Sequence, residues 1–472
     1  MKEYGLFIDG NWTMAKETLS VVNKASGQEI GRIAAAGETE VKQAVDAAEK
    51  AFKGIKLEPY ARYEILLKAS QLLRQNQAKM AEALSLEVGK PIKEARAEVS
   101  RAEQTLILSA EEAKRMTGDM VPLAGAPGCG ERWAFTLRVP VGIVCAITPF
   151  NFPLNLACHK IGPALAAGNT VIYKPATATP LSAVLLCEIF AEAGLPGGFL
   201  NLLTGSGSKL GKLLTEEKRI GFYSFTGSPE VGKALRKNAG LRRVSLELGS
   251  NSANIVHHDA DIAVTAGLCA KYAFANAGQV CISCQRVYVH RSVYREFCDQ
   301  AVAYTRNLVM GDPLDPATDI GPMISETEAV RTEEWLAAAV AQGAKILAGG
   351  KRRGAWFDPT ILTDVRSDMS IVWQEAFAPI FSIIPYDSIE EAIEWVNHSV
   401  YGLQAGVFTA SLDIARLCAL KIETGGVIIN DGATFRTDNM PYGGIKDSGI
   451  GREGPQYAVK EMTEEKLIVF KF

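Results

Sequence analysis

The sequence predicts an α/β protein with two helix-covered sheets and a small additional β element. Between residues 141 and 247, apolar strand-like runs alternate with helix-like stretches, a pattern typical of parallel βαβ units. The pattern restarts after Glu247, and a strand-like segment follows at residues 465–472. A chain of 472 residues is too long for one ordinary core, so we expect two or three domains.

Helical periodicity comes first along the chain. Apolar residues share one helical face over residues 39–53, and further amphipathic stretches cover 61–86 and 95–115. From Val139 the period changes to that of strands. The strand-like runs are 141–147, 170–173, 199–203, 220–225 and 243–246, and the helix-like stretches between them lie near 158–167, 180–193, 208–216 and 229–238.

The second sheet is predicted from the segment after Glu247. Residues 261–276 have the pattern of a helix, 286–290 of a strand and 293–308 of a helix. Further strand and helix patterns follow as far as Asn430. The apolar segment 465–472 has the pattern of an edge strand, and an exposed apolar edge tends to aggregate unless it is paired. We therefore expect a partner subunit.

Composition and charge exclude several classes of protein. The formal charge is −3 and no basic block stands out, which gives no reason to expect nucleic acid or an anionic membrane as partner. No apolar run approaches the about 18 residues of a membrane span, and the first seven residues lack a signal-peptide core. The nine cysteines are scattered, with only Cys281 and Cys284 in a CxxC pair. We expect no metal site, and free thiols in a reducing cytoplasm.

Cys281 is a candidate nucleophile. It follows Asn276-Ala277-Gly278-Gln279, small and polar residues that can end a helix and let a loop approach a ligand. A reactive cysteine needs a setting that stabilises the thiolate, and its Gly, Gln and Ser neighbours are polar. The alternative is a buried structural cysteine, which is a common role of this residue.

Glu247 and Asn151 are the other two candidates. Glu247 ends an apolar strand, at the rim where open α/β sheets bind ligands, and burial there would raise its pKa towards that of a general base. Asn151 follows the strand 141–147 in a turn flanked by Pro149 and Pro153, where its amide could donate to an oxyanion. The alternatives are a capping or salt-bridged Glu and an ordinary turn Asn.

Seven motifs, in order along the chain, resemble those of the aldehyde dehydrogenase superfamily. They are PFNFP at 149–153, KPA at 174–176, FTGS at 225–228, LELG at 246–249, GQVC at 278–281, EAFAP at 375–379 and PYGGIKDSGIGREG at 441–454. By this resemblance Cys281 is the nucleophile, Glu247 the general base and Asn151 the oxyanion donor. The chain departs from the family's usual ELGG and FGP at Ser250 and Ala378, two small replacements that tolerate positive φ less readily than glycine.

The resemblance also implies a domain plan. Residues 1–118 and 140–248 would form a Rossmann-like NAD(P)-binding domain and residues 249–447 a second α/β domain that carries the catalytic site. Residues 119–139 and 455–472 would form a small β oligomerisation element, in a homodimer or homotetramer. Glu247 argues against a CoA-acylating relative, whose thiol acceptor needs no base to activate water.

A nicotinamide cofactor, NAD or NADP, is implied because oxidation of a thiohemiacetal requires a hydride acceptor. The GxGxxG fingerprint is absent. By the resemblance the pyrophosphate lies near Gly227-Ser228, at the start of the helix 229–238. The other residues that the resemblance assigns to the cofactor are Lys174 on the adenosine ribose, Glu375 on the nicotinamide ribose, Phe377 beside the nicotinamide, Thr148, Pro149 and Phe150 along the cleft, and Gly207 near the adenine.

Thr177 predicts acceptance of NADP. Many NAD-preferring relatives carry Glu three residues after the Lys of KPA, where a carboxylate would repel a 2′-phosphate. Here Thr177 stands at that position, and Lys174 could help to bind the phosphate. The alternative is that Thr177 merely loosens NAD binding.

The substrate is expected to be a small aldehyde, and the family analogy places His159 and Arg436 at its tunnel. A positively charged tunnel suits an aldehyde with a carboxylate, sulfonate or phosphonate, such as a semialdehyde or a lactaldehyde-like compound. The alternatives are a surface His159 and a salt-bridged Arg436. The sequence is also compatible with two other functions. One is esterase or thioesterase action at Cys281, and the other is that of a non-catalytic binding protein with the same fold.

Overall fold

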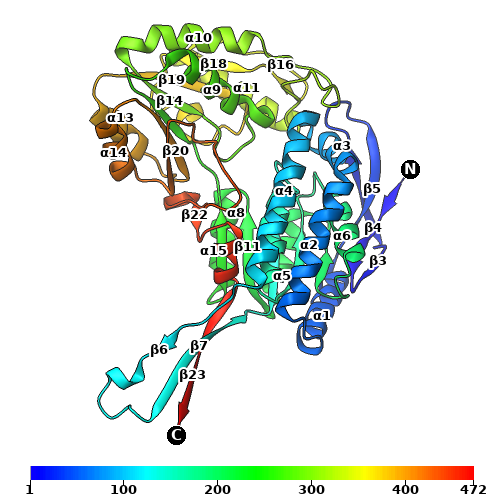
Figure 1. The fold of residues 1–472 in the computed structure, drawn as a ribbon. Coiled ribbons are helices and arrows are strands. Elements are labelled where there is room, and N and C mark those ends of the chain that lie inside the picture. The colour runs from blue at the N-terminus through cyan, green and yellow to red at the C-terminus, as the bar shows by residue number, and fades with distance from the viewer. Residues whose placement is uncertain (1) are drawn as a thin grey trace.

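The computed structural model describes residues 2–472 and contains two large α/β layers (Figure 1). The first sheet has eight strands, with a parallel centre in the order β12-β11-β8-β9-β10. In spatial order its strands are β22 (Gly449–Ile450), β12 (Arg243–Glu247), β11 (Ile220–Thr226), β8 (Ile143–Ile147), β9 (Thr170–Lys174), β10 (Leu200–Leu202), β2 (Leu6–Ile8) and β3 (Asn11–Thr13).

Helices cover both faces of this sheet because its strand side chains alternate between two apolar clusters. Val144 and Ala146 of β8 pack into one cluster, whereas Ile143 and Cys145 pack into the other. The helices on the first face are α2 (Pro59–Gln75), α3 (Gln77–Val88), α4 (Ile92–Ala113), α5 (Asn155–Ala166), α6 (Leu181–Glu192) and α15 (Pro455–Glu461). Those on the second face are α1 (Glu38–Gly54), α7 (Gly207–Glu216) and α8 (Pro229–Ala239).

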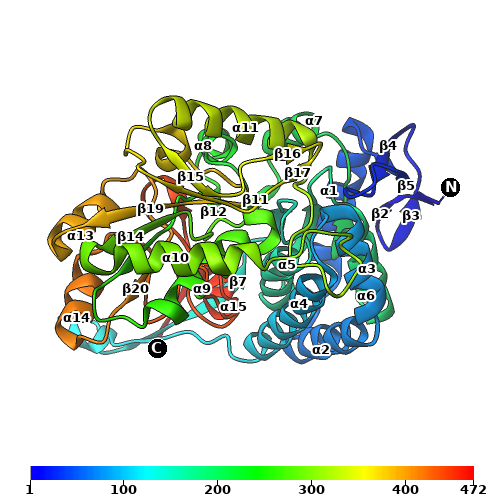
Figure 2. The ribbon, with the colours of Figure 1, turned by 90° about the horizontal axis from the view of Figure 1, so that it is seen from above.

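The second sheet has seven strands and is parallel except at β15. Its order is β15 (Lys345–Ala348), β18 (Thr360–Thr363), β19 (Ile380–Tyr386), β14 (Arg286–His290), β13 (Ala253–Val256), β20 (Gln404–Phe408) and β21 (Gly426–Ile429). On one face lie α9 (Ile262–Phe274), α10 (Tyr294–Arg306) and α11 (Glu326–Ala341), and on the other α13 (Ile389–Asn397) and α14 (Leu412–Lys421). Figure 2 shows α10 and α11 over the strands.

A three-stranded sheet projects from the rest of the molecule (Figure 1). It contains β6 (Met120–Val121), β7 (Arg132–Pro140) and β23 (Thr463–Lys471), and β23 pairs with β7 along its whole length. The segment predicted as an edge strand therefore is one. Large apolar side chains stay exposed on these strands, among them Trp133, Leu137, Leu467 and Phe470.

The predicted α/β class is confirmed, with local corrections. The amphipathic stretch 61–86 is two helices rather than one, because the chain breaks at Asn76 between α2 and α3. The N-terminal strands were not predicted; besides β2 and β3 they form a small sheet of β1 (Glu3–Tyr4), β5 (Glu29–Ala35) and β4 (Glu17–Val22). Within residues 2–472, no helix is long and apolar enough to cross a membrane.

Candidate active site

A cavity of about 1530 Å³ lies where the parallel strand order of the first sheet reverses. Strands β8 and β11 are neighbours there, but their connections run to opposite sides, and ligands of open α/β sheets bind at such a point. All residues predicted to bind the cofactor line this cavity: Thr148, Pro149, Phe150, Lys174, Thr177, Gly207, Gly227, Ser228, Glu375 and Phe377. Asn151, Cys281 and Arg436 line it too.

The loop that carries Cys281 has an unusual backbone. After α9 ends at Phe274, Asn276, Ala277 and Gly278 follow with φ of 50°, 53° and 70°. Two non-glycine residues in the left-handed region store strain, which persists only where the surroundings hold it. Gly278 is required here, since a Cβ at this position would lie 1.9 Å from the carbonyl oxygen of Ala378.

Hydrogen bonds with three distant segments of the chain hold this loop. The backbone N–H of Asn276 donates to Glu94 Oε2 at 2.9 Å. The side-chain amide of Asn151 donates to the Gln279 carbonyl at 2.8 Å, and Gln279 Oε1 accepts the N–H of Ile324 at 2.9 Å. The prediction that a helix ends before Cys281 is confirmed. The loop that follows this helix is held by residues that are distant in the sequence.

Cys281 is half-buried, and its Sγ lies 3.0 Å from the hydroxyl of Tyr442. The apolar side chains that pack around it are Phe152, Val280, Ile282, Leu403 and Tyr442. Burial raises the pKa of Cys281 to about 12, although the Tyr442 hydroxyl opposes the shift. The polar sequence neighbours therefore do not produce a thiolate-stabilising setting in this structure. Cys284 is fully buried and accepts a bond from Asn254 Nδ2 at 2.9 Å.

Asn151 directly follows β8 and is buried at the cavity wall. Its amide nitrogen carries two protons, of which one is given to the Gln279 carbonyl, so one remains for a substrate oxygen. Asn151 Oδ1 is buried without a hydrogen-bond partner in the described chain.

Glu247 lies at the end of β12 and is 3% exposed. Among residues 2–472 neither of its carboxylate oxygens has a hydrogen-bond partner. Burial and then the charge of Glu453 raise its pKa well above the usual range, in the direction expected from the sequence. Glu247 is not one of the residues that line the cavity, and its carboxylate lies beside Gly443, where a Cβ would come within 2.8 Å of Oε1.

A second buried carboxylate, Glu453, was not singled out from the sequence. Lys160 Nζ donates to Glu453 Oε1 at 2.8 Å, and Arg436 donates to Oε2 at 2.9 Å. Burial opposes ionisation, but Lys160 and Arg436 outweigh it and hold the pKa of Glu453 below its usual range. A lysine in the largely apolar helix α5 was the sequence pattern that could have pointed to this pair.

The residues expected around the pyrophosphate and adenosine lie at helix starts. Ser228 caps α8, its Oγ accepting the N–H of Val231 at 3.4 Å, and Gly207 begins α7. Burial lowers the pKa of Lys174 to about 8, and its Nζ donates to the Pro175 carbonyl at 3.0 Å. The hydroxyl of Thr177 donates to the Gly205 carbonyl at 2.8 Å, so it already has a partner.

Glu375 and Phe377 form the opposite wall. Glu375 Oε1 accepts the N–H of Ser250 at 3.0 Å, and burial raises the pKa of Glu375 to about 7. Phe377 has a φ of 49° and meets Phe150 edge to face, with 5.8 Å between ring centroids. Ser250 and Ala378 are not among the described residues with positive φ, so the two replacements strain nothing.

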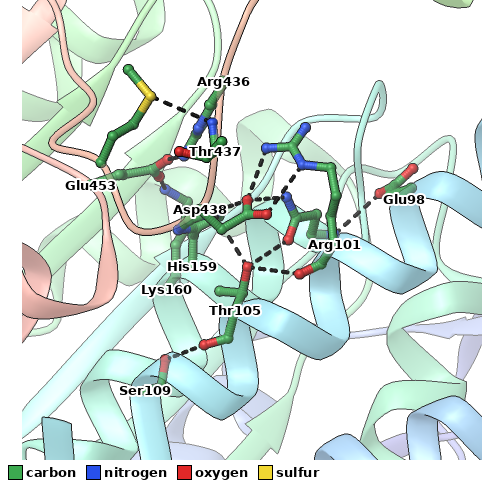
Figure 3. A network of polar contacts seen from close by, with 12 residues as sticks. Glu98, Arg101, Thr105, Ser109, His159, Lys160, Arg436, Thr437, Asp438 and Glu453 are labelled. Atoms are coloured by element: carbon green, nitrogen blue, oxygen red, sulfur yellow. Dashed lines mark hydrogen bonds and ion pairs between the residues drawn. The ribbon is translucent and has the colours of Figure 1, made fainter. Parts of the chain in front are cut away.

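His159 lies neither at the cavity wall nor on the helix surface, which differs from both sequence interpretations. Its side chain is buried behind the wall, with Nε2 2.9 Å from Asp438 Oδ1 (Figure 3). Burial and the nearby Arg436 lower its pKa. The cavity wall instead carries Arg101, which no sequence pattern singles out, since an arginine is ordinary on an amphipathic helix.

The cavity has the parts of a dinucleotide-dependent oxidoreductase site, with a thiol, an amide donor, two helix starts and half-buried Glu375 around one space. The comparisons identify the class. The chain belongs to the aldehyde dehydrogenase family, whose model matches residues 12–468.

Three relatives illustrate the similarity. The chain is 53% identical to a 3-sulfolactaldehyde dehydrogenase of Priestia aryabhattai over 99% of this chain and 98% of that protein. It is 37% identical, with a TM-score of 0.97, to aldehyde dehydrogenase 21 of Physcomitrella patens in complex with the reaction product succinate, over 100% and 98% of the two chains. It is 40% identical, with a TM-score of 0.93, to the glyceraldehyde-3-phosphate dehydrogenase GapN of Methanocaldococcus jannaschii complexed with NADP, over 96% and 99%.

The reactivity of Cys281 should depend steeply on pH. Because burial raises its pKa to about 12, the neutral thiol dominates near neutral pH, and the thiolate fraction rises about tenfold per pH unit. We expect alkylation of the free enzyme by iodoacetamide, followed by mass spectrometry at Cys281, to accelerate about 100-fold between about pH 7 and about pH 9. Buried Cys284 serves as the internal control and should stay unlabelled. A rate that levels off below about pH 8 would contradict the raised pKa.

Proposed function

We propose that this enzyme oxidises a small anionic aldehyde to its carboxylic acid, with NAD or NADP as hydride acceptor. The observation that carries the proposal is the shared cavity, in which Cys281 and Asn151 meet the candidate cofactor residues and two arginines, Arg101 and Arg436. Aldehyde dehydrogenase membership and the anionic ligands named for the relatives support it.

In the proposed mechanism the Cys281 thiol gives its proton to water in the cavity, and its Sγ then attacks the aldehyde carbonyl. The free N–H of Asn151 and a backbone N–H near Cys281 stabilise the oxyanion. A bound nicotinamide would supply the hydride acceptor, and loss of hydride leaves a thioester on Cys281. Glu247 then takes a proton from water, and the resulting hydroxide adds to the thioester carbonyl. The C–S bond breaks to release the acid, and the Cys281 thiolate takes up a proton to restore the thiol.

The pKa of Glu247 suits this role, because a carboxyl with a raised pKa takes a proton more readily than an exposed one. Its carboxylate must approach the thioester from its place beside Gly443, and its two unpartnered oxygens leave it free to do so.

We assign residues 1–118 and 140–248 to cofactor binding, 249–447 to the catalytic domain, and 119–139 with 455–472 to oligomerisation. A homodimer or homotetramer would cover the exposed apolar side chains of β7 and β23. The nine cysteines are all free, which supports a reducing compartment such as the cytoplasm.

The test of the function is a panel of aldehydes crossed with both cofactors, followed by NAD(P)H absorbance. We expect anionic aldehydes to have a kcat/KM about tenfold or more above that of neutral ones of equal length. Cys281→Ala should abolish turnover, while the matched variant Cys284→Ala should retain it. Cofactor-independent hydrolysis of a nitrophenyl ester without any NAD(P)H production would favour an esterase, and no reaction at all a binding protein.

Glu247→Gln should slow hydrolysis of the thioester more than hydride transfer, because the amide cannot take a proton from water. We expect a pre-steady-state burst of NAD(P)H in stopped-flow absorbance, followed by turnover reduced about 100-fold or more. If the burst disappears as well, Glu247 acts mainly on the thiol of Cys281.

Thr177→Glu should shift cofactor preference towards NAD, since the carboxylate repels a 2′-phosphate and can accept bonds from ribose hydroxyls. The ratio of kcat/KM for NADP to that for NAD should fall about tenfold or more. Thr177→Val is the matched control, because it also loses the bond to Gly205 but adds no charge. Equal ratios in all three enzymes, with strict NAD dependence, would contradict this view of the pocket.

A further inference from the structure

Asp438 lies at the centre of a buried polar network that the proposed mechanism does not use (Figure 3). Its Oδ1 accepts from Arg101 Nη2 at 2.8 Å and from Asn155 Nδ2 at 3.0 Å, and Oδ2 accepts from Arg101 Nε at 3.2 Å. His159 adds a contact of 2.9 Å to Oδ1. Arg101 and Asn155 line the main cavity, whereas Asp438 is not among the residues that line it.

The two bonds to Arg101 fix the plane of its guanidinium, as bidentate arginine–carboxylate pairs do. Asn155 is fixed as well, because its Oδ1 accepts from Thr105 at 2.9 Å. The side chain of Arg101 remains 35% exposed, and its other N–H groups have no partner among the hydrogen bonds of the described chain.

Arg436 connects this wall to the nucleophile. Its guanidinium carbon lies 3.7 Å from the centre of the Tyr442 ring, and the Tyr442 hydroxyl lies 3.0 Å from Cys281 Sγ. Arg436 Nε is buried without a hydrogen-bond partner in the described chain. Two arginines therefore line the same cavity as the thiol, and each has at least one N–H group without a hydrogen-bond partner among the described residues.

The ion pairs of the network leave one positive charge over. Arg101 pairs with Asp438, while Arg436 and Lys160 share Glu453. Nearby Glu247 adds no compensating charge in the free enzyme as long as it is protonated, the form that its raised pKa favours. Burial lowers the pKa of His159, so the imidazole adds no charge near neutral pH. An uncompensated buried charge is unfavourable, and a ligand with one negative charge would neutralise it.

We propose that Asp438 is a positioning residue that holds the Arg101 guanidinium in place, so that Arg101 and Arg436 together bind a singly charged substituent of the aldehyde. This inference rests on the proposed function and narrows its substrate class to monoanions such as carboxylates and sulfonates. Asp438 acts through Arg101 and does not touch the substrate.

The test measures kcat and KM of the full-length enzyme with three aldehydes: succinic semialdehyde with one charge, glyceraldehyde 3-phosphate with two, and uncharged butanal. Arg101→Ala should raise the KM for succinic semialdehyde about tenfold or more and leave kcat/KM for butanal within about twofold. Asp438→Asn should raise that KM about fivefold with kcat nearly unchanged, and should have no further effect in the Arg101→Ala background.

The charge count gives an independent readout. Asp438→Asn leaves two positive charges over, so kcat/KM for glyceraldehyde 3-phosphate relative to succinic semialdehyde should rise about fivefold. Asp387→Asn is the matched control, because Asp387 makes the same two-bond pair with Arg291 at an exposed site, and it should change none of these values.

The inference would be overturned if the effects of Arg101→Ala and Asp438→Asn on the KM for succinic semialdehyde were additive. It would also be overturned if kcat/KM fell equally for all three aldehydes, because Asp438 would then have only a structural role. If Asp438→Asn fails to fold by circular dichroism, Arg101→Lys replaces it. That variant keeps the charge and loses the two-bond geometry, and a wild-type KM for succinic semialdehyde would overturn the inference. A wild-type enzyme that prefers butanal also refutes it, whereas one that oxidises no aldehyde refutes the proposed function itself.

Discussion

The hydrogen bond from the Asn151 amide to the Gln279 carbonyl is the contact on which the candidate site depends. Asn151 follows β8 of the first sheet, and Gln279 belongs to the loop between α9 and β14 of the second sheet. The bond therefore sets the position of Cys281 relative to the part of the cavity wall that the first sheet supplies. It also holds a loop whose Asn276 and Ala277 are in left-handed conformations that an isolated peptide would rarely adopt.

Electrostatics in this site follows from burial more than from sequence neighbours. Glu247 and Glu453 are both 3% exposed, yet their pKa values move in opposite directions. Glu453 is hydrogen-bonded to two cations, whereas Glu247 has no hydrogen-bond partner among residues 2–472. Burial and the charge of Glu453 raise the pKa of Glu247 more than the nearby cations lower it. The Glu453 carboxylate is thereby kept ionised and holds its two cationic partners in place, whereas the Glu247 carboxyl can exchange a proton.

The parallel strands, the helices between them and the gathering of the candidate cofactor residues around one cavity could be predicted from the sequence, because each depends on local periodicity or on a motif. The short N-terminal strands could not, since segments such as Asn11–Thr13 are too short and too exposed to show a period. The surroundings of Cys281 were mispredicted, because Phe152 and Leu403 reach it from distant parts of the chain. The Arg101–Asp438 pair was missed for the same reason, as its partners are 337 residues apart.

The pairing of β7 with β23 has a consequence for biosynthesis. Residues 132–140 lie beside 463–471 in register, from Pro140 opposite Thr463 to Arg132 opposite Lys471. A nascent chain cannot complete this sheet until residues 463–471 have been synthesised, although the parallel strands of the first sheet, which end at residue 247, emerge much earlier. During that interval β7 is an unpaired apolar edge, the kind of segment that chaperones shield. A chain interrupted before β23 would keep this edge of β7 exposed. Chaperones and proteases could distinguish it by that edge from a chain that contains β23.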